Sequence, residues 1–138
     1  MTLAEKQRLL IDGLAIIPDA QERLAIAVER ARHLPPPAPG ERVDANRVPG
    51  CVSTVWLIGE IRDGRLRLRA DADSPLVKGL VALLCELYDD TDPAEAAAVE
   101  PVLLEELRLT QNLSPTRRNG LAAVRARIRE LAARHRPV

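Results

Sequence analysis

Residues 51–88 read CVSTVWLIGEIRDGRLRLRADADSPLVKGLVALLCELY. Two β-prone runs flank Asp63-Gly64, and Asp-Gly between such runs is a strong hairpin signal. In the second run, leucines at positions 66 and 68 alternate with arginines, which predicts one face against a core and one face in solvent. Ser74-Pro75 then supplies a helix N-cap and a proline at the first helical position. The stretch therefore predicts an antiparallel hairpin followed by a helix.

The helix expected after Ser74 is apolar over more than half of its circumference as far as Tyr88. We therefore expect it to form the centre of the core. Gly79 and Ala82 are small enough to let a second element approach closely on another side. Cys85 lies within the apolar part of this helix, and we interpret it as a core residue.

Further helices are expected on both sides of this stretch. Thr2–Glu5 and Asp19–Glu22 each match a capping box, and the second helix must end before the prolines at 35–37. Residues 35–50 hold five prolines and two glycines, which predicts a stiff surface loop. Ser114-Pro115 starts a long C-terminal helix, whose apolar stripe recurs every three or four residues: Leu121, Val124, Ile128 and Leu131.

The chain has 138 residues and a mass of 15.1 kDa. This is the size of one domain, so we expect a single α+β domain over residues 1–138, with a small antiparallel sheet packed against helices. Residues 86–106 are acidic and lack lysine and arginine, and residues 89–106 are expected to hold one or two short helices broken near Pro93 and Pro101. The C-terminal helix is rich in arginine, so the zero net charge hides an acidic middle and a basic end.

Composition excludes several classes of function. Aromatic residues make up 1% of the chain, which argues against a base-stacking platform for nucleic acid. Zero net charge provides no general attraction to nucleic acid or anionic lipid. No apolar run is long enough to cross a bilayer, and no signal peptide is recognised, so a cytoplasmic location is expected. Two cysteines cannot form a disulfide framework.

Cys51 follows Pro49-Gly50 at the step from the loop into the first strand, where a scaffold can hold a thiol at an exposed tip. Gly50 permits close approach of a partner's backbone. Position alone leaves two interpretations open, a functional thiol or a buried structural cysteine. A metal site would need both cysteines together with His33 and His135, at no short ligand spacing. A cysteine hydrolase would need one of these histidines as a base, and neither is favourably placed.

Arg117 is the second candidate. It precedes Leu121 by four residues, which places it on the azimuth of the apolar stripe, so we expect it to point inward. An inward cation in the first turn of a helix calls for a carboxylate partner. Asp71 and Asp73, after the hairpin, are the nearest suitable acids. A structural salt bridge and a functional cation are both open interpretations of Arg117.

Three blocks of the sequence resemble those of the SufE family, the sulfur-acceptor proteins of iron–sulfur cluster assembly. Residues 50–56, GCVSTVW, resemble its G-C-x-S-x-V-W signature. Residues 71–80, DADSPLVKGL, resemble its D-S-D-x-x-I-V-K-G-L block, and residues 113–121, LSPTRRNGL, its L-T-P-S-R-x-x-G-L block. The departures are Ala72 for a serine and exchanges between serine and threonine at positions 114 and 116, which keep the capping chemistry.

The resemblance implies the α+β fold that SufE proteins share with U-type cluster scaffolds, with the sulfur-accepting cysteine on a loop. U-type scaffolds use three cysteines to hold a cluster, and this chain has two, so a scaffold function is not expected. No cofactor is expected on this chain, because the pyridoxal phosphate (PLP) belongs to the partner desulfurase. Cys51 could be sheltered in an apolar pocket at rest.

By the same resemblance, Cys51 takes persulfide sulfur from a PLP-dependent, SufS-like cysteine desulfurase and stimulates it. The chain would be an accessory sulfur carrier, not an enzyme, and would deliver sulfur to a downstream Fe–S scaffold as a monomer or weak homodimer. Arg117 would raise the thiolate fraction, and Gly50, Asp71, Asp73 and Lys78 would support it or contact the partner. The alternative is a regulatory module that binds a desulfurase without taking sulfur.

Overall fold

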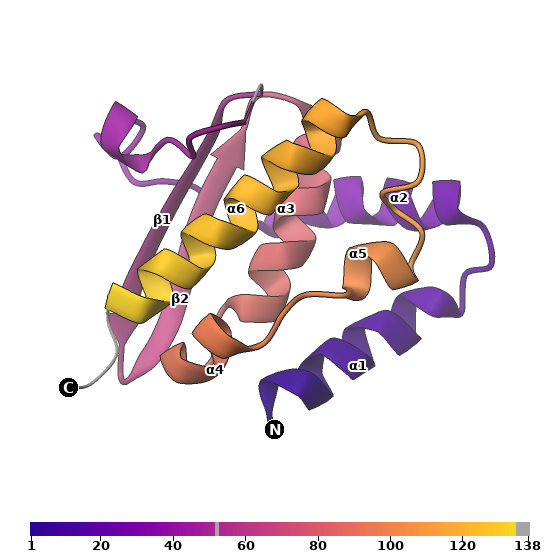
Figure 1. Cartoon of the computed structure of the whole chain (residues 1–138), viewed down its shortest axis with the longest axis horizontal. Coiled ribbons are helices and arrows are strands. Elements are labelled where there is room, and N and C mark those ends of the chain that lie inside the picture. The colour runs from indigo at the N-terminus through magenta and orange to yellow at the C-terminus, as the bar shows by residue number, and fades with distance from the viewer. Residues whose placement is uncertain (52, 135–138) are drawn as a thin grey trace.

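A computed structural model describes residues 1–51 and 53–134. A two-stranded antiparallel sheet packs against helices, as predicted (Figure 1). The elements, in chain order, are α1 (Leu3–Ala15), α2 (Ala20–Arg30), 3₁₀ helices η1 (Ala31–His33) and η2 (Asp44–Asn46), β1 (Val55–Arg62), β2 (Arg65–Ala72), α3 (Pro75–Tyr88), α4 (Pro93–Ala98), α5 (Leu103–Glu106) and α6 (Pro115–Arg134).

The predicted hairpin turns at Asp63-Gly64, and both residues have positive φ, 54° and 77°. Positive φ at both central residues is what a tight turn between twisted strands requires. Loops cover both edges of the sheet. The Val48 amide donates to the Val55 carbonyl at 2.8 Å beside β1, and the Leu66 amide donates to the Thr91 carbonyl at 2.8 Å beside β2. The hairpin is therefore held in place from both sides.

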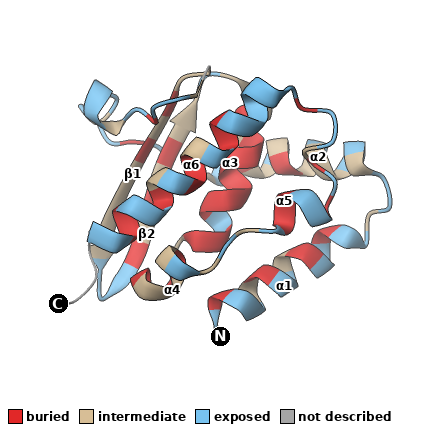
Figure 2. Cartoon of the chain, in the orientation of Figure 1, coloured by how far each residue is buried: buried red, intermediate tan, exposed pale blue. Residues whose placement is uncertain are grey.

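Helix α3 is the centre of the core, as predicted from its apolar sequence, and contacts α1, α2, α6 and β2. Ten of its residues are buried, which Figure 2 shows as a nearly continuous red ribbon. The Ser74 hydroxyl caps its first turn by accepting from the Val77 amide at 3.4 Å. A Cβ at Gly79 would lie 3.0 Å from the Val28 backbone, so the predicted close approach is made by α2.

The N-terminal helices begin at the predicted caps, with one difference. Thr2 and Glu5 form the complete capping box of α1. Asp19 instead caps α2 through the Gln21 amide, at 3.1 Å. The loop after η1 starts at the prolines, where a helix cannot continue.

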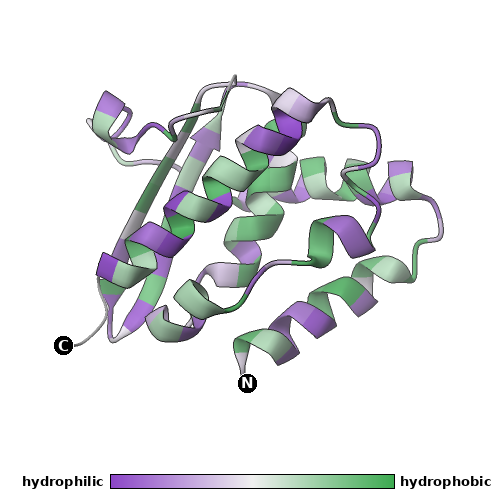
Figure 3. Ribbon diagram, viewed as in Figure 1, coloured by the Kyte–Doolittle hydropathy of each residue, from purple (hydrophilic) through white to green (hydrophobic). Residues whose placement is uncertain are grey.

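Helix α6 lies across β1 and α3 (Figure 1), and hydrophobic and hydrophilic residues alternate along it (Figure 3). It approaches β1 so closely at Gly59 that a Cβ there would lie 3.1 Å from the Leu131 side chain. The four stripe residues are buried as predicted: Leu121, Val124, Ile128 and Leu131. No helix in the described part of the chain is long and apolar enough to cross a membrane.

Candidate functional site

Cys51 lies where the proline-rich loop ends, four residues before β1. Gly50 has a φ of 80°, a left-handed conformation that favours glycine over every other residue. A Cβ at Gly50 would be 3.8 Å from the Ala123 Cβ, so the loop passes directly beside α6. The thiol of Cys51 is half-buried between this loop and the helix.

The thiol borders a narrow cavity of about 10 Å³, which we call the thiol cavity. This is at or below the roughly 10–15 Å³ that one water molecule needs. Gly120, in the second turn of α6, lies against the sulfur: a Cβ there would be 2.9 Å from Cys51 Sγ. Real side chains do not approach that closely, so the thiol occupies space that only glycine leaves free. The other lining residues are Ser53, Val77, Thr116, Arg117 and Leu121.

Burial raises the pKa of the Cys51 thiol above its ordinary value. A hydrogen bond from the Ser53 backbone and the charge of Arg47 act in the opposite direction, and the carboxylate of Asp73 raises the pKa further. The resting thiol is therefore protonated at neutral pH. Arg117, the cation expected to activate Cys51, is not among the groups that shift this pKa.

The expectation that Arg117 points inward is wrong. Residues 114–119, at the start of α6, are all exposed. The backbone amide of Arg117 donates to Ser114 Oγ at 3.2 Å, and the residue lines the thiol cavity. Among the described residues, the buried arginine of α6 is Arg125, about two turns later at the edge of the apolar stripe, which is 7% exposed.

Asp71, Asp73 and Lys78 do not pair with Arg117 within the described residues. Asp71 forms ion pairs with Arg42 at 2.9 Å and Lys78 at 3.3 Å. Asp73 Oδ1 accepts from the Thr54 amide at 3.2 Å, and the Asp73 amide donates to the Thr54 carbonyl at 3.1 Å. Asp73 thus holds Thr54, the residue before β1, whereas Asp71 and Lys78 form a separate surface cluster.

Sequence reasoning missed Gly120 and Arg47. Gly120 stands in the third of the blocks that resemble the SufE family, but a glycine in a helix does not by itself reveal which residue lies against it. Arg47 lies in the proline-rich loop and acts through its charge on Cys51. No pattern in the loop sequence indicates that proximity.

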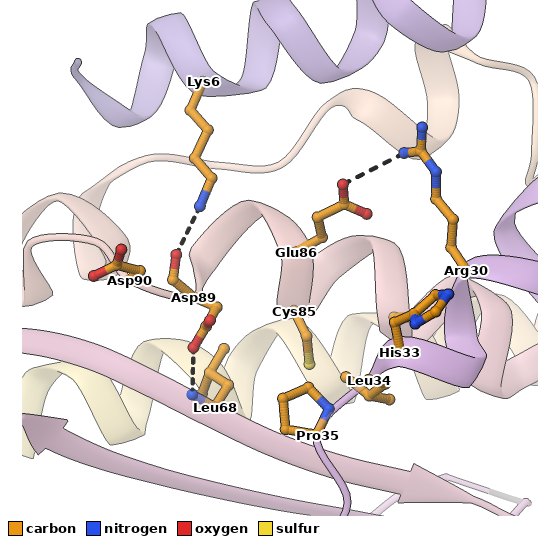
Figure 4. A pocket seen from close by; sticks show the side chains of 11 residues that line it. Lys6, Arg30, His33, Leu34, Pro35, Leu68, Cys85, Glu86, Asp89 and Asp90 are labelled. Carbon is orange, nitrogen blue, oxygen red and sulfur yellow. Dashed lines mark hydrogen bonds and ion pairs between the residues drawn. The ribbon is translucent and has the colours of Figure 1, made fainter.

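Cys85 is a core residue, as predicted. It is 2% exposed, and burial raises its pKa to about 12. It lies at a different cavity, of about 550 Å³, where Figure 4 shows its sulfur directed toward Pro35. The charged groups around this cavity pair within the chain: Lys6 Nζ donates to the Asp89 carbonyl at 2.6 Å, and Arg30 pairs with Glu86 at 3.4 Å (Figure 4).

His33 lines the Cys85 cavity, and no histidine among the described residues lines the thiol cavity. His135 falls outside the described residues. Within the described ranges, no group of three or more His, Cys, Asp or Glu side chains is arranged to hold a metal ion. What the arrangement offers chemically is one accessible thiol, held protonated beside a glycine of α6.

The chain is similar to several known proteins. The sequence model of the SufE domain, described as an Fe–S metabolism associated domain, matches residues 8–132. A SufE-like protein of Rhizobium etli is 33% identical over 128 residues, which cover 89% of this chain and 86% of that protein. A SufE-like protein of Synechocystis sp. is 34% identical over 74% of this chain and 64% of its own length.

Two other proteins extend the comparison. The chloroplastic quinolinate synthase of Oryza sativa subsp. japonica is 40% identical over 71% of this chain, but the match covers 14% of that much longer protein. The solution structure of a hypothetical protein from Thermus thermophilus superposes with a TM-score of 0.78, at 24% identity, over 94% of both chains. The last likeness shows the shared fold. The chain belongs to the SufE family, and this membership supports a role in Fe–S metabolism.

Proposed function

We propose that this protein takes persulfide sulfur from a PLP-dependent, SufS-like cysteine desulfurase onto Cys51 and stimulates that enzyme. The sulfur would then pass to an Fe–S scaffold. The observation that carries this proposal is the contrast between the two thiols. Cys51 is half-exposed on a loop fixed by Gly50 and Asp73, whereas Cys85 is buried in the core.

The proposed transfer is a thiol exchange. The Cys51 thiolate attacks the outer sulfur of the persulfide on the desulfurase cysteine, and a bond forms between Cys51 Sγ and that sulfur. The sulfur–sulfur bond of the desulfurase persulfide breaks, and its cysteine leaves with the electron pair as a thiolate. No net oxidation occurs, because the sulfane sulfur moves from one thiol to another. The C–S chemistry and the PLP belong to the desulfurase, so no cofactor is required on this chain.

The raised pKa of Cys51 makes the free protein a poor nucleophile at neutral pH, since a thiolate is the reacting species. Burial is the main cause of the raised pKa, so movement of the side chain out of the thiol cavity on docking would lower it. The charge of Arg47 would then favour the thiolate. Docking is thereby coupled to activation of Cys51.

The supporting residues have three different roles. Arg117 is exposed beside the thiol cavity, where its charge is available to the partner or to the persulfide anion. Asp71 and Lys78, with Arg42, form a surface cluster suited to contact with a partner. Asp73 acts through the backbone of Thr54, by holding the segment that carries Cys51.

A kinetic experiment separates this function from that of a regulatory module that takes no sulfur. Alanine production by a cysteine desulfurase is measured with free cysteine as substrate and dithiothreitol as final sulfur acceptor. Wild-type protein and the Cys85→Ala control should both stimulate the desulfurase, and Cys51→Ser should leave it at its own rate. Full stimulation by Cys51→Ser would show a regulator and overturn the proposal.

A further inference from the structure

The thiol cavity, which Cys51 Sγ borders, leaves no space for a second sulfur atom. Its volume is about 10 Å³, and a divalent sulfur atom is larger than the water molecule that needs roughly 10–15 Å³. Toward α6 the fit is tighter still, because one added carbon at Gly120 would lie 2.9 Å from Sγ. In a persulfide, the outer sulfur extends about 2.05 Å beyond Sγ. The cavity therefore leaves no room for the outer sulfur of a persulfide on Cys51.

We propose that sulfur loading itself turns the Cys51 side chain out of the thiol cavity, and that Gly120 is the positioning residue that makes the cavity selective for the unloaded thiol. This inference rests on the proposed function in one respect, that Cys51 is the residue that carries sulfur. It adds that the unloaded and the loaded protein differ in the position of the Cys51 side chain. The empty carrier keeps its thiol sheltered, and the loaded carrier presents its outer sulfur to the next acceptor.

Electrostatics also favour a position of the loaded Cys51 side chain outside the thiol cavity. A persulfide is more acidic than a thiol, so at neutral pH the loaded residue carries more negative charge, which is costly to bury. The carboxylate of Asp73 opposes negative charge on Cys51 at its resting position. The cations on this side of the molecule, Arg47 and Arg117, favour the anion once it has left the cavity.

Gly120→Ala tests the proposal and should leave the fold intact. The added Cβ meets the end of a flexible side chain, Cys51 Sγ, while the Cys51 Cα stays at 3.7 Å, an ordinary contact. The substitution should therefore displace the thiol and leave the loop and α6 in place. Gly13→Ala is the matched control, because it adds the same methyl group within a helix where nothing lies within 4 Å.

The experiment loads Cys51 chemically, with sodium tetrasulfide, and needs no desulfurase. The Cys51 thiolate takes one sulfane sulfur and releases trisulfide. Alkylation of the Cys51 peptide by iodoacetamide is then followed by mass spectrometry for the thiol and the persulfide forms. Because no partner takes part, failure of this inference stays separate from failure of sulfur transfer from a desulfurase.

Gly120→Ala should raise the alkylation rate of the thiol by about tenfold or more, since overpacking of this size strongly depopulates the sheltered position. It should change the rate of the persulfide by less than about twofold, because the loaded side chain is already outside. Gly13→Ala should change neither rate. Equal acceleration of both forms by Gly120→Ala, or no acceleration of the thiol, would overturn the proposal. So would a wild-type persulfide that is alkylated more slowly than the wild-type thiol.

A second measurement confirms that the effect acts through the sulfur. In a Cys51→Ala background the Sγ atom is absent, so Gly120→Ala meets only ordinary contacts and gains helix propensity. Unfolding in urea should then show that Gly120→Ala has a more favourable effect on the free energy of unfolding in the Cys51→Ala background than in the wild type. An identical effect in both backgrounds would contradict a contact between Gly120 and the Cys51 thiol.

Discussion

Cys85 and Cys51 hold their protons for the same physical reason but to different ends. Burial raises the pKa of both thiols. Cys85 stays within the core of α3, where its neutral form contributes packing. Cys51 lies at the surface, where one movement of its side chain removes the burial. At the scale of single residues, the reactivity of a buried thiol therefore depends on whether its side chain can move out to solvent.

The Cys85 thiol predicts a pH-dependent stability. Its pKa is about 12 in the folded protein, against about 8.5 for an unfolded thiol. Below about pH 8.5 both states keep the proton; above it, the unfolded state loses the proton first, so the free energy of unfolding falls as pH rises toward 12.

Cys85→Ala removes this term and leaves Cys51 and Tyr88 in both proteins. The stability of the wild type relative to Cys85→Ala should therefore drop by about 1.4 kcal/mol between pH 7 and pH 9.5. Urea unfolding at the two pH values measures it. A difference that is the same at both values would show that Cys85 is not buried as described.

At the scale of elements, α6 is joined to α4 by one buried arginine. Arg125 donates to the carbonyls of Ala96 at 3.0 Å and Val99 at 2.9 Å, where α4 ends. Its guanidinium lies 4.7 Å from the centre of the Tyr88 ring, and Tyr88 donates to the same Val99 carbonyl at 2.7 Å. These bonds satisfy carbonyls that a helix end leaves without partners.

Arg125→Met should lower the free energy of unfolding by about 2–4 kcal/mol, because it removes the side-chain donor to the buried Ala96 carbonyl and one of the two side-chain donors to the Val99 carbonyl. Arg32→Met is the control, since Arg32 forms an exposed pair with Glu29 and its loss should cost less than about 0.5 kcal/mol. Both are measured by urea unfolding. An Arg125→Met protein as stable as the control would refute this role of Arg125 in joining the two helices.

At the scale of the whole molecule, the acidic middle and the basic end of the chain meet. Arg125 and Arg129 of α6 both pair with Glu100, which follows α4. Arg8 of α1 pairs with Glu106 at 3.2 Å. Among the described residues, Glu100 therefore links the acidic middle to the basic C-terminal helix, and other acids of the middle pair with arginines of α1, α2 and β2.

The hairpin, the central helix and the C-terminal helix were predictable, because turn residues, caps and apolar periodicity are local signals. The site was predictable only in part. Cys51 follows from its place after Gly50 and from the resemblance to a family. The orientation of Arg117 does not follow, because position 117 lies in line with the apolar stripe and position 125 at its edge, and only packing decides which one is covered. Gly120 was missed because its partner is far away in the sequence.

Mass spectrometry of the protein after incubation with a cysteine desulfurase and free cysteine shows whether Cys51 takes up sulfur. One added sulfur atom on the peptide that contains Cys51, and an unmodified Cys85, is the predicted result. Sulfur on Cys85, or no added sulfur on a protein that still stimulates the desulfurase, would contradict it.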